Sequence, residues 1–182
     1  MEGTDLGMNS NSIFNGVFAL PLIPFLEDES LDEGSYVNEL EFCVQAKVHG
    51  IAVPLESGEF YRLSDQERFR IAEMTVRTVA GRCPVVIGVS ATNAPLAVEF
   101  ARHAQMIGAD AILATPPYIT PTPFAHVIKY FQAIAAVCDK PIILQNARPP
   151  LAPTLSADAI YEIILAVNNI KCVKEEAIPT GQ

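Results

Sequence analysis

Lys174 is the residue of this sequence whose position most suggests chemistry, because it ends a short apolar run that begins at Ile170. Two carboxylates, Glu175 and Glu176, follow it directly. If the run is a buried strand of a parallel α/β barrel, the lysine lies at the strand end that opens into the active site. An amine packed there against apolar neighbours loses hydration of its charged form, so its pKa falls and it can attack a carbonyl to form a Schiff base. The same segment also fits a solvated lysine just beyond a strand, so it leaves both interpretations open.

The chain around this lysine contains a repeated pattern of short apolar runs, each followed by a loop and a longer amphipathic stretch. The runs recur about every 30 residues, which is the size of a βα unit. They are apolar throughout rather than alternating, as is typical of parallel strands covered on both faces. We expect strands at Gly16–Leu20, Ile51–Pro54, Val85–Val89, Ala111–Ala114, Ile142–Gln145 and Ile170–Lys174.

The stretches between these runs contain helix signals. Ser64 and Glu67 form a capping box at the start of one stretch, and Gly81 follows its end. Pro95 and Pro123 each lie near the first turn of another stretch, a position that favours proline. We expect helices at Leu31–Val48, from Ser64 to about Ala80, at Pro95–Ile107, at Thr122–Val137 and at Ser156–Val167.

Successive βα units indicate either a doubly wound sheet or a (β/α)8 barrel, both of class α/β. No G-x-G-x-x-G segment follows the first run, and the regular units with short loops favour the barrel. A whole barrel needs about 250 residues, whereas this chain has 182. We therefore expect a partial TIM-barrel domain over residues 13–182 with about six βα units, the last two units being missing, after a flexible tail over residues 1–12.

Composition argues against several classes of partner. The net charge is −9 and the basic residues are scattered, so neither a nucleic-acid surface nor attraction to an anionic membrane is expected. No apolar stretch reaches membrane-spanning length, and the first residues do not resemble a signal peptide. The cysteines, Cys43, Cys83, Cys138 and Cys172, lie far apart without zinc-ligand spacing. We expect reduced thiols in a cytoplasmic protein, with no metal and no cofactor.

Several segments together resemble the dihydrodipicolinate synthase and N-acetylneuraminate lyase family of Schiff-base aldolases. Each motif is weak alone, but their order and spacing along nearly the whole chain are specific. The matching segments are Gly16–Phe25, Glu56–Phe60 with Leu63-Ser64 and Glu67-Arg68, Gly81–Val89, Gly108–Ala111 with Pro116-Pro117-Tyr118, Pro141–Asn146 and Val173-Lys174-Glu175. The resemblance implies a (β/α)8 barrel and a lyase or aldolase that acts on a small 2-keto acid of the pyruvate type.

The resemblance also implies roles for individual residues. Lys174 stands where the family has its Schiff-base lysine, and Tyr118 matches the first tyrosine of the family's pair. Gln145 replaces the tyrosine that relays protons near the lysine, so we expect these three residues in catalytic positions. For substrate binding we expect Ser57, which stands at a hydroxyl position of the family's G-T-T-G-E segment. Glu56 and Asn146 belong to the same expected group, with Glu56 contacting a substrate hydroxyl.

Three departures from the family pattern bear on the reaction. Glutamine at position 145 cannot perform acid–base work at neutral pH. The second tyrosine of the pair is Ile119, and Pro150 takes the place of a substrate-binding arginine, with Arg148 two positions away. Dihydrodipicolinate synthesis itself is therefore not expected. A related aldolase, dehydratase or lyase, cleaving a carbon–carbon or carbon–oxygen bond, fits these residues better.

Two other functions remain open at this point. A truncated barrel could be a non-catalytic relative that acts as an interaction or assembly protein, because missing units leave strand edges and apolar helix faces exposed. The same argument leads us to expect a homo-oligomer. A barrel enzyme of another class, such as a phosphate-binding isomerase, is less consistent with the chain, since that site usually uses the loops after the seventh and eighth strands.

Overall fold

The structure is a computed structural model that describes residues 14–176 and residue 178. Its centre is a single parallel sheet with the strand order β1-β2-β3-β4-β5-β6, so that β1 and β6 are the end strands of the described sheet. The strands are β1 Phe18–Ala19, β2 Gly50–Val53, β3 Val85–Gly88, β4 Ala111–Ala114, β5 Ile142–Asn146 and β6 Ile170–Glu175. The tail predicted over residues 1–12 lies outside the described residues.

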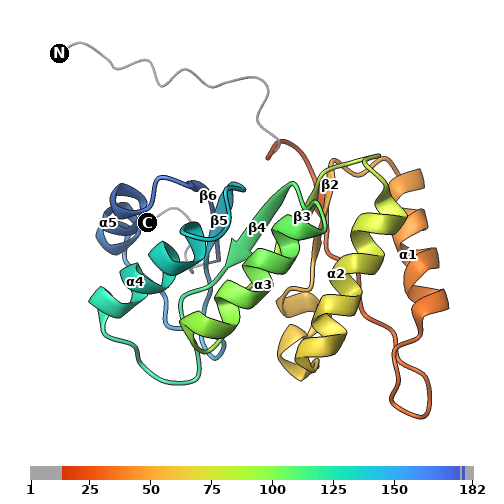
Figure 1. Ribbon diagram of the computed structural model, residues 1–182, viewed down its shortest axis with the longest axis horizontal. Helices are drawn as coiled ribbons and strands as arrows, with labels where there is room; N and C mark the ends of the chain where they lie inside the picture. The colour runs from red at the N-terminus through yellow and green to blue at the C-terminus, as the bar shows by residue number, and fades with distance from the viewer. Residues whose placement is uncertain (1–13, 177, 179–182) are drawn as a thin grey trace.

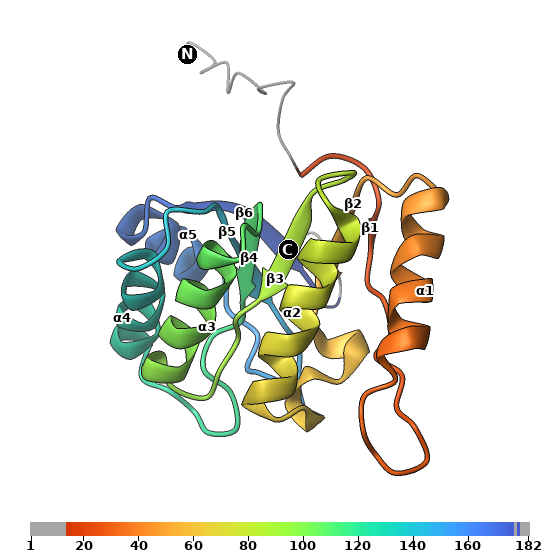
Figure 2. The same cartoon turned by 45° about the vertical axis from the view of Figure 1, so that its right-hand side comes forward.

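Within the described residues, each strand is followed by a helix before the next strand begins, and the helices form an outer layer around the curved sheet (Figures 1 and 2). Neighbouring helices contact one another along this layer. The helices are α1 Glu33–Gln45, α2 Asp65–Val79, α3 Ala94–Met106, α4 Phe124–Ala135 and α5 Ala157–Ala166. Two short 3₁₀ turns, η1 Glu56–Gly58 and η2 Phe60–Arg62, connect β2 to α2. The fold is thus an α/β half-barrel, as the sequence predicted.

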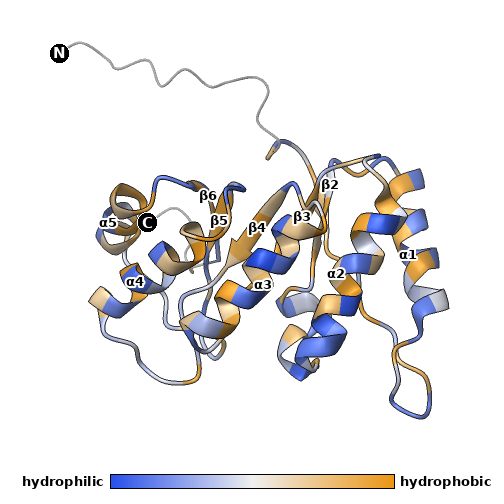
Figure 3. Ribbon diagram, in the orientation of Figure 1, coloured by the Kyte–Doolittle hydropathy of each residue, from blue (hydrophilic) through white to orange (hydrophobic). Residues whose placement is uncertain are grey.

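Alternating side chains of the strands divide the core into two layers, because successive residues of a strand point to opposite faces. Ile51, Ile87 and Leu144 belong to the larger cluster, between the sheet and the helices. The smaller cluster lies on the inner face of the half-barrel, where a cavity of about 310 Å³ opens. Its buried members are Ala52, Leu55, Val86, Ala111, Leu113 and Ile143. In Figure 3 the strands are coloured largely as hydrophobic, whereas α2 and α3 in front of them carry many hydrophilic residues.

The predicted strands and helices are all present, with small differences at their ends. β1 is the main difference, since it contains only Phe18 and Ala19, which pair with Gly50 and Ile51 of β2. Pro21 follows closely and has no N–H to extend the ladder. The capping box of α2 forms as predicted: the Ser64 hydroxyl accepts from the Glu67 backbone N–H, and the Glu67 carboxylate accepts from the Ser64 backbone N–H.

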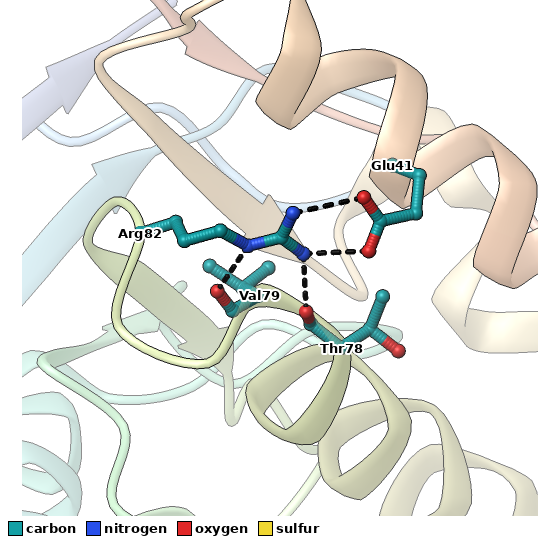
Figure 4. Close-up of polar contacts among 4 residues, drawn as sticks. All are labelled: Glu41, Thr78, Val79 and Arg82. Carbon is teal, nitrogen blue, oxygen red and sulfur yellow. Dashed lines mark hydrogen bonds and ion pairs between the residues drawn. The ribbon is translucent and has the colours of Figure 1, made fainter.

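Arg82 joins the first two helices near the C-terminal end of α2 (Figure 4). Its guanidinium donates to both carboxylate oxygens of Glu41 on α1, at 2.9 and 2.6 Å. It also donates to the carbonyl oxygens of Val79 and Thr78 at the C-terminal end of α2, at 3.0 and 2.6 Å. These carbonyls have no partner within the helix, so the arginine both caps α2 and holds it against α1. The hydrogen bond from Arg82 lowers the pKa of Glu41.

Gly88, the last residue of β3, allows a close approach between two chain segments at the C-terminal edge of the sheet. A Cβ atom at this position would lie 2.1 Å from the carbonyl oxygen of Pro54 and 2.9 Å from Leu55. Only glycine therefore lets the chain that leaves β2 cross so near to β3. This approach leads directly into η1, which contains two of the predicted site residues.

Candidate active site

A cleft of about 870 Å³ lies at the C-terminal ends of the strands. Its walls come from the residue after β1, the two turns after β2, the loop after β5 and the end of β6. The residues that line it are Leu20, Glu56, Ser57, Glu59, Tyr61, Arg148, Lys174, Glu176 and Ile178. In parallel barrels this end of the sheet is the place of the active site.

Lys174 and Gln145 lie side by side across the two last strands, since they are register partners in the parallel ladder of β5 and β6. Ile143 and Cys172, two positions earlier, belong to the inner cluster, so both polar side chains point to the inner face of the half-barrel. Gln145 is only 2 % exposed. The Lys174 side chain is about one-third exposed at 31 % and faces the cleft.

Glu176 connects these two residues. One of its oxygens, Oε2, accepts a hydrogen bond of 2.9 Å from Gln145 Nε2, and the other, Oε1, pairs with Lys174 Nζ. Burial of the Glu176 carboxyl favours its neutral form, but the hydrogen bonds from Lys174 and Gln145 outweigh burial and lower its pKa. The carboxylate is therefore charged at neutral pH, directly beside the amine.

Glu56 and Ser57 are positioned by η1, which begins as soon as β2 ends. The backbone N–H of Gly58 donates to the Leu55 carbonyl at 3.0 Å, and that of Glu59 donates to the Glu56 carbonyl at 2.9 Å. Glu59 has a left-handed backbone (φ 48°) that ends η1 and begins η2. This tight double turn places Ser57, which is exposed, and Glu56, which is partly buried, on the wall of the cleft.

Tyr118 does not line the lysine cleft. It lines a neighbouring cavity of about 460 Å³ together with Thr92, Ile119, Pro150 and Leu151. The two cavities share Glu56 and Tyr61, so they are adjacent. The Tyr118 ring makes an edge contact with Phe60, with centroids 5.7 Å apart, and burial raises the pKa of its hydroxyl.

Asn146 is not brought to the cleft either. It follows Gln145 in the strand and therefore points to the opposite, helix-covered face. Its amide donates to the Glu175 carboxylate at 2.9 and 3.0 Å and to the Leu155 carbonyl, and it accepts from the Leu155 N–H at 2.8 Å. It is 1 % exposed. This position differs from the substrate contact that the sequence suggested, and it makes Asn146 an anchor for the chain leading into α5.

Arg68 lies behind the site, and no site role was predicted for it, although Glu67-Arg68 is among the segments that match the family. The residue is 5 % exposed, and its guanidinium donates to the carbonyls of Ser90 (2.9 Å) and Gly88 (3.1 Å), at the end of β3. It packs over the Phe100 ring, 3.8 Å from the centroid. Burial lowers its pKa to about 10, so it remains charged at neutral pH. A charged helix residue normally faces solvent, so the match of Glu67-Arg68 to the family was the signal that could have pointed to this one.

Glu176 was also missed as a site residue, although its position directly after the strand's lysine and Glu175 was a visible signal. Arg148 lines the cleft although it is displaced from the family's arginine position.

Among the described residues, no cluster of three His, Cys, Asp or Glu side chains has a metal-binding arrangement. None of the helices in the described part of the chain has the length and apolarity needed to cross a bilayer.

The fold and the cleft define a class: a parallel (β/α) barrel architecture with a lysine, a carboxylate and polar turn residues at the carboxyl ends of its strands. Residues 13–179 match the Dihydrodipicolinate synthetase family. The chain belongs to this family, and the resemblance seen in its motifs is confirmed.

Relatives of known sequence agree with this assignment. The chain is 35% identical over 160 residues to an uncharacterized DapA-like lyase from Thermococcus onnurineus, covering 88% of this chain and 54% of the relative. It is 32% identical over 162 residues to the 4-hydroxy-tetrahydrodipicolinate synthase of Desulfotalea psychrophila, covering 89% and 54%. The chain thus spans about half the length of the curated relatives it matches.

Solved structures show the same architecture. Dihydrodipicolinate synthase from Aquifex aeolicus superposes with a TM-score of 0.86 at 28% identity, covering 92% of this chain and 56% of that one. YagE, a prophage protein of the same family from E. coli K12 whose structure contains pyruvate, gives 0.87 at 29% identity, covering 92% and 56%. The half-barrel described above corresponds to about half of these larger chains.

Proposed function

We propose that the protein is a Schiff-base lyase or aldolase that acts on a small 2-keto acid, with Lys174 as the residue that forms the imine. The observation that carries this proposal is the position of Lys174 at the C-terminal end of β6, in the cleft and beside Gln145 and Glu176. Membership of a family that includes lyases supports it, as does the pyruvate in the related YagE structure.

The cleft offers groups for each part of such a substrate. The amine of Lys174 would attack the keto carbon, and the resulting iminium withdraws electrons from the carbon chain, so that a carbon–carbon bond or a hydroxyl beyond the α-carbon can break through an enamine. Ser57, with the exposed turn around it, and Arg148 would hold the substrate carboxylate. Glu56 would bind a hydroxyl further along the substrate, in the region shared with the Tyr118 cavity.

The reaction is proposed to differ from dihydrodipicolinate synthesis. Gln145 occupies the register position beside the lysine and carries no acidic hydroxyl. Ile119 is 81% exposed and supplies no hydroxyl either. The carboxylates of Glu56 and Glu59 face the same cleft and would repel a second negative charge on the substrate. A 2-keto acid whose far end carries hydroxyl groups therefore fits better than one with a distant carboxylate.

A borohydride experiment tests this proposal. The protein, expressed in its full reading frame, is incubated with pyruvate and borohydride, and the reduced adduct is mapped by peptide mass. We expect the adduct on Lys174, its loss in Lys174→Ala, and its retention in Lys171→Ala, which removes an exposed lysine of the same strand. An adduct on another lysine, or trapping by Lys174→Ala, would overturn the assignment. Condensation of pyruvate with aspartate semialdehyde should be slow, and a rate of about 1–10³ s⁻¹ would contradict the proposed difference in reaction.

An interaction or assembly role is the second candidate, and exposed apolar side chains favour it. Val17, Tyr161 and Leu165 are more than half exposed. A protein that traps no keto acid but forms a stable assembly would support this role. For the enzyme, we include a homo-oligomer and a cytoplasmic location in the proposal, since oligomerisation would cover such apolar side chains.

A further inference from the structure

We propose that Glu176 is the acid–base residue of the lysine site and that Gln145 is the positioning residue that holds its carboxylate. The inference rests on the proposed Schiff-base function and deepens it, because it supplies the proton transfers that Gln145 itself cannot perform. Among the residues that the structure describes, Tyr61 is the one tyrosine that lines the lysine cleft, and it also lines the neighbouring cavity.

The geometry gives each oxygen of Glu176 a distinct contact. Oε1 pairs with the Nζ atom that would become the imine nitrogen. Oε2 accepts from the Gln145 amide at 2.9 Å. Gln145 is almost fully buried and is the register partner of Lys174, so its amide is a rigid donor. The glutamine thus fixes the carboxylate against the amine, and a proton-transfer group must be within hydrogen-bond reach of the proton it takes.

The charges around the cleft are consistent with a carboxylate that works as a base first. Lys174 and Arg148 face Glu176 with positive charge, while Glu56 and Glu59 line the same cleft with negative charge. The hydrogen bonds to Glu176 hold its pKa below the ordinary value despite its burial, so it enters the reaction ionised. The groups that could compete for this role are less well placed: Tyr118 lines the adjacent cavity, and no hydrogen bond connects Glu56 or Glu59 to Lys174 among the described contacts.

During imine formation, each proton that leaves the Lys174 ammonium has a named acceptor. Glu176 takes one proton from the Lys174 ammonium, and the neutral amine attacks the keto carbon. The nitrogen passes a second proton to the former carbonyl oxygen, which gives a neutral carbinolamine. The protonated Glu176 then gives its proton to the carbinolamine hydroxyl, which leaves as water, and the nitrogen keeps its last proton in the iminium. Glu176 returns to the carboxylate, ready to accept a proton from the carbon next to the iminium as the enamine forms.

The test measures how fast the imine forms with pyruvate in the full-length protein, by quenching with borohydride at different times. We expect Glu176→Gln, which keeps the size of the side chain, to slow trapping by about 10²–10⁴-fold. Glu162→Gln, which removes an exposed carboxylate on α5, is the matched control and should trap at the wild-type rate. Gln145→Leu should lie between the two, because the carboxylate remains but loses its anchor.

A small acid distinguishes proton transfer from structural damage. In Glu176→Ala, added formate should restore the trapping rate in proportion to its concentration, whereas it should leave Lys174→Ala inactive. Trapping by Glu176→Gln at the wild-type rate, or no response of Glu176→Ala to formate, would overturn the role of Glu176 and leave the Schiff-base function intact. Absence of any adduct in the wild-type protein would overturn both.

Discussion

Replacement of Arg68 by methionine should be among the most damaging single changes in the described part of the chain. The arginine is 5% exposed, and its guanidinium donates to the carbonyl oxygens of Gly88 and Ser90, at the strand end that supports the cleft. Methionine fills a similar volume but donates no hydrogen bond. The change therefore removes a donor from two buried carbonyls while keeping the packing against Phe100 largely intact.

The expected loss is about 4 kcal/mol of unfolding free energy. A buried polar group that loses its partner costs about 1–3 kcal/mol, and two carbonyls are affected. Loss of the cation over Phe100 adds to the cost, and release of a desolvated charge offsets part of it. For a chain of this size the change corresponds to a fall of about 8–16 °C in the midpoint of thermal unfolding.

Urea unfolding and thermal melting of the full-length protein, followed by circular dichroism, would measure the effect. Arg70→Met is the matched control, because Arg70 lies on the same helix but makes its ion pair with Glu33 at the surface. Arg68→Lys should fall between the wild type and Arg68→Met, since an ammonium group cannot reproduce the two-pronged donation. Equal stability of Arg68→Met and Arg70→Met would refute the argument that a buried arginine supports the end of β3.

Two further changes test other parts of the structure. Gly88→Ala should lower the unfolding free energy by about 1–3 kcal/mol through overpacking, because the new Cβ would lie 2.1 Å from the Pro54 carbonyl. Gly34→Ala, whose Cβ meets only Asp32 at 3.6 Å, should not destabilise, and equal melting of the two variants would contradict the close approach. Glu176 has a pKa lowered below its ordinary 4.5, so its contribution to stability is present above pH 4.5 and is lost as the pH falls through the lower, folded-state value. Glu176→Gln should therefore remove part of the stability loss seen below pH 4.5, and an unchanged acid profile would show that its bonds to Lys174 and Gln145 do not stabilise the fold.

The order of strands and helices follows from local features of the sequence. Apolar runs of strand length can be covered on both faces only in a parallel sheet with helices outside, and the structure has that arrangement. Ser64 and Ser156 were predicted to begin helices, and each accepts a hydrogen bond from a backbone N–H of its first turn. Lys174 was placed at a strand end from the apolar run before it, and β6 ends one residue later. Such signals are readable because they involve neighbours along the chain.

The composition of the site depended on contacts between distant residues, which no local pattern contains. Gln145 and Asn146 are adjacent in sequence, yet only the register of β5 against β6 decides that the first faces the lysine and the second faces the helices. Tyr118 belongs to the neighbouring cavity because of the path taken by the loop after β4.

Glu176 and Arg68 show most clearly why contacts between distant residues decide the composition of the site. Glu176 lies one residue beyond β6 and two residues after Lys174, so the strand alternation carries it to the same inner side, where its N–H still bonds to Asn146 of β5. Only the packing of β5 beside β6, however, gives its carboxylate two partners. Arg68 resembles a surface residue of an amphipathic helix, but the carbonyls at the end of β3 and the ring of Phe100 stabilise it inside. The sequence alone determined the elements and the lysine, whereas the tertiary structure decided which polar groups meet around it, because burial makes an isolated polar group costly and a partnered one favourable.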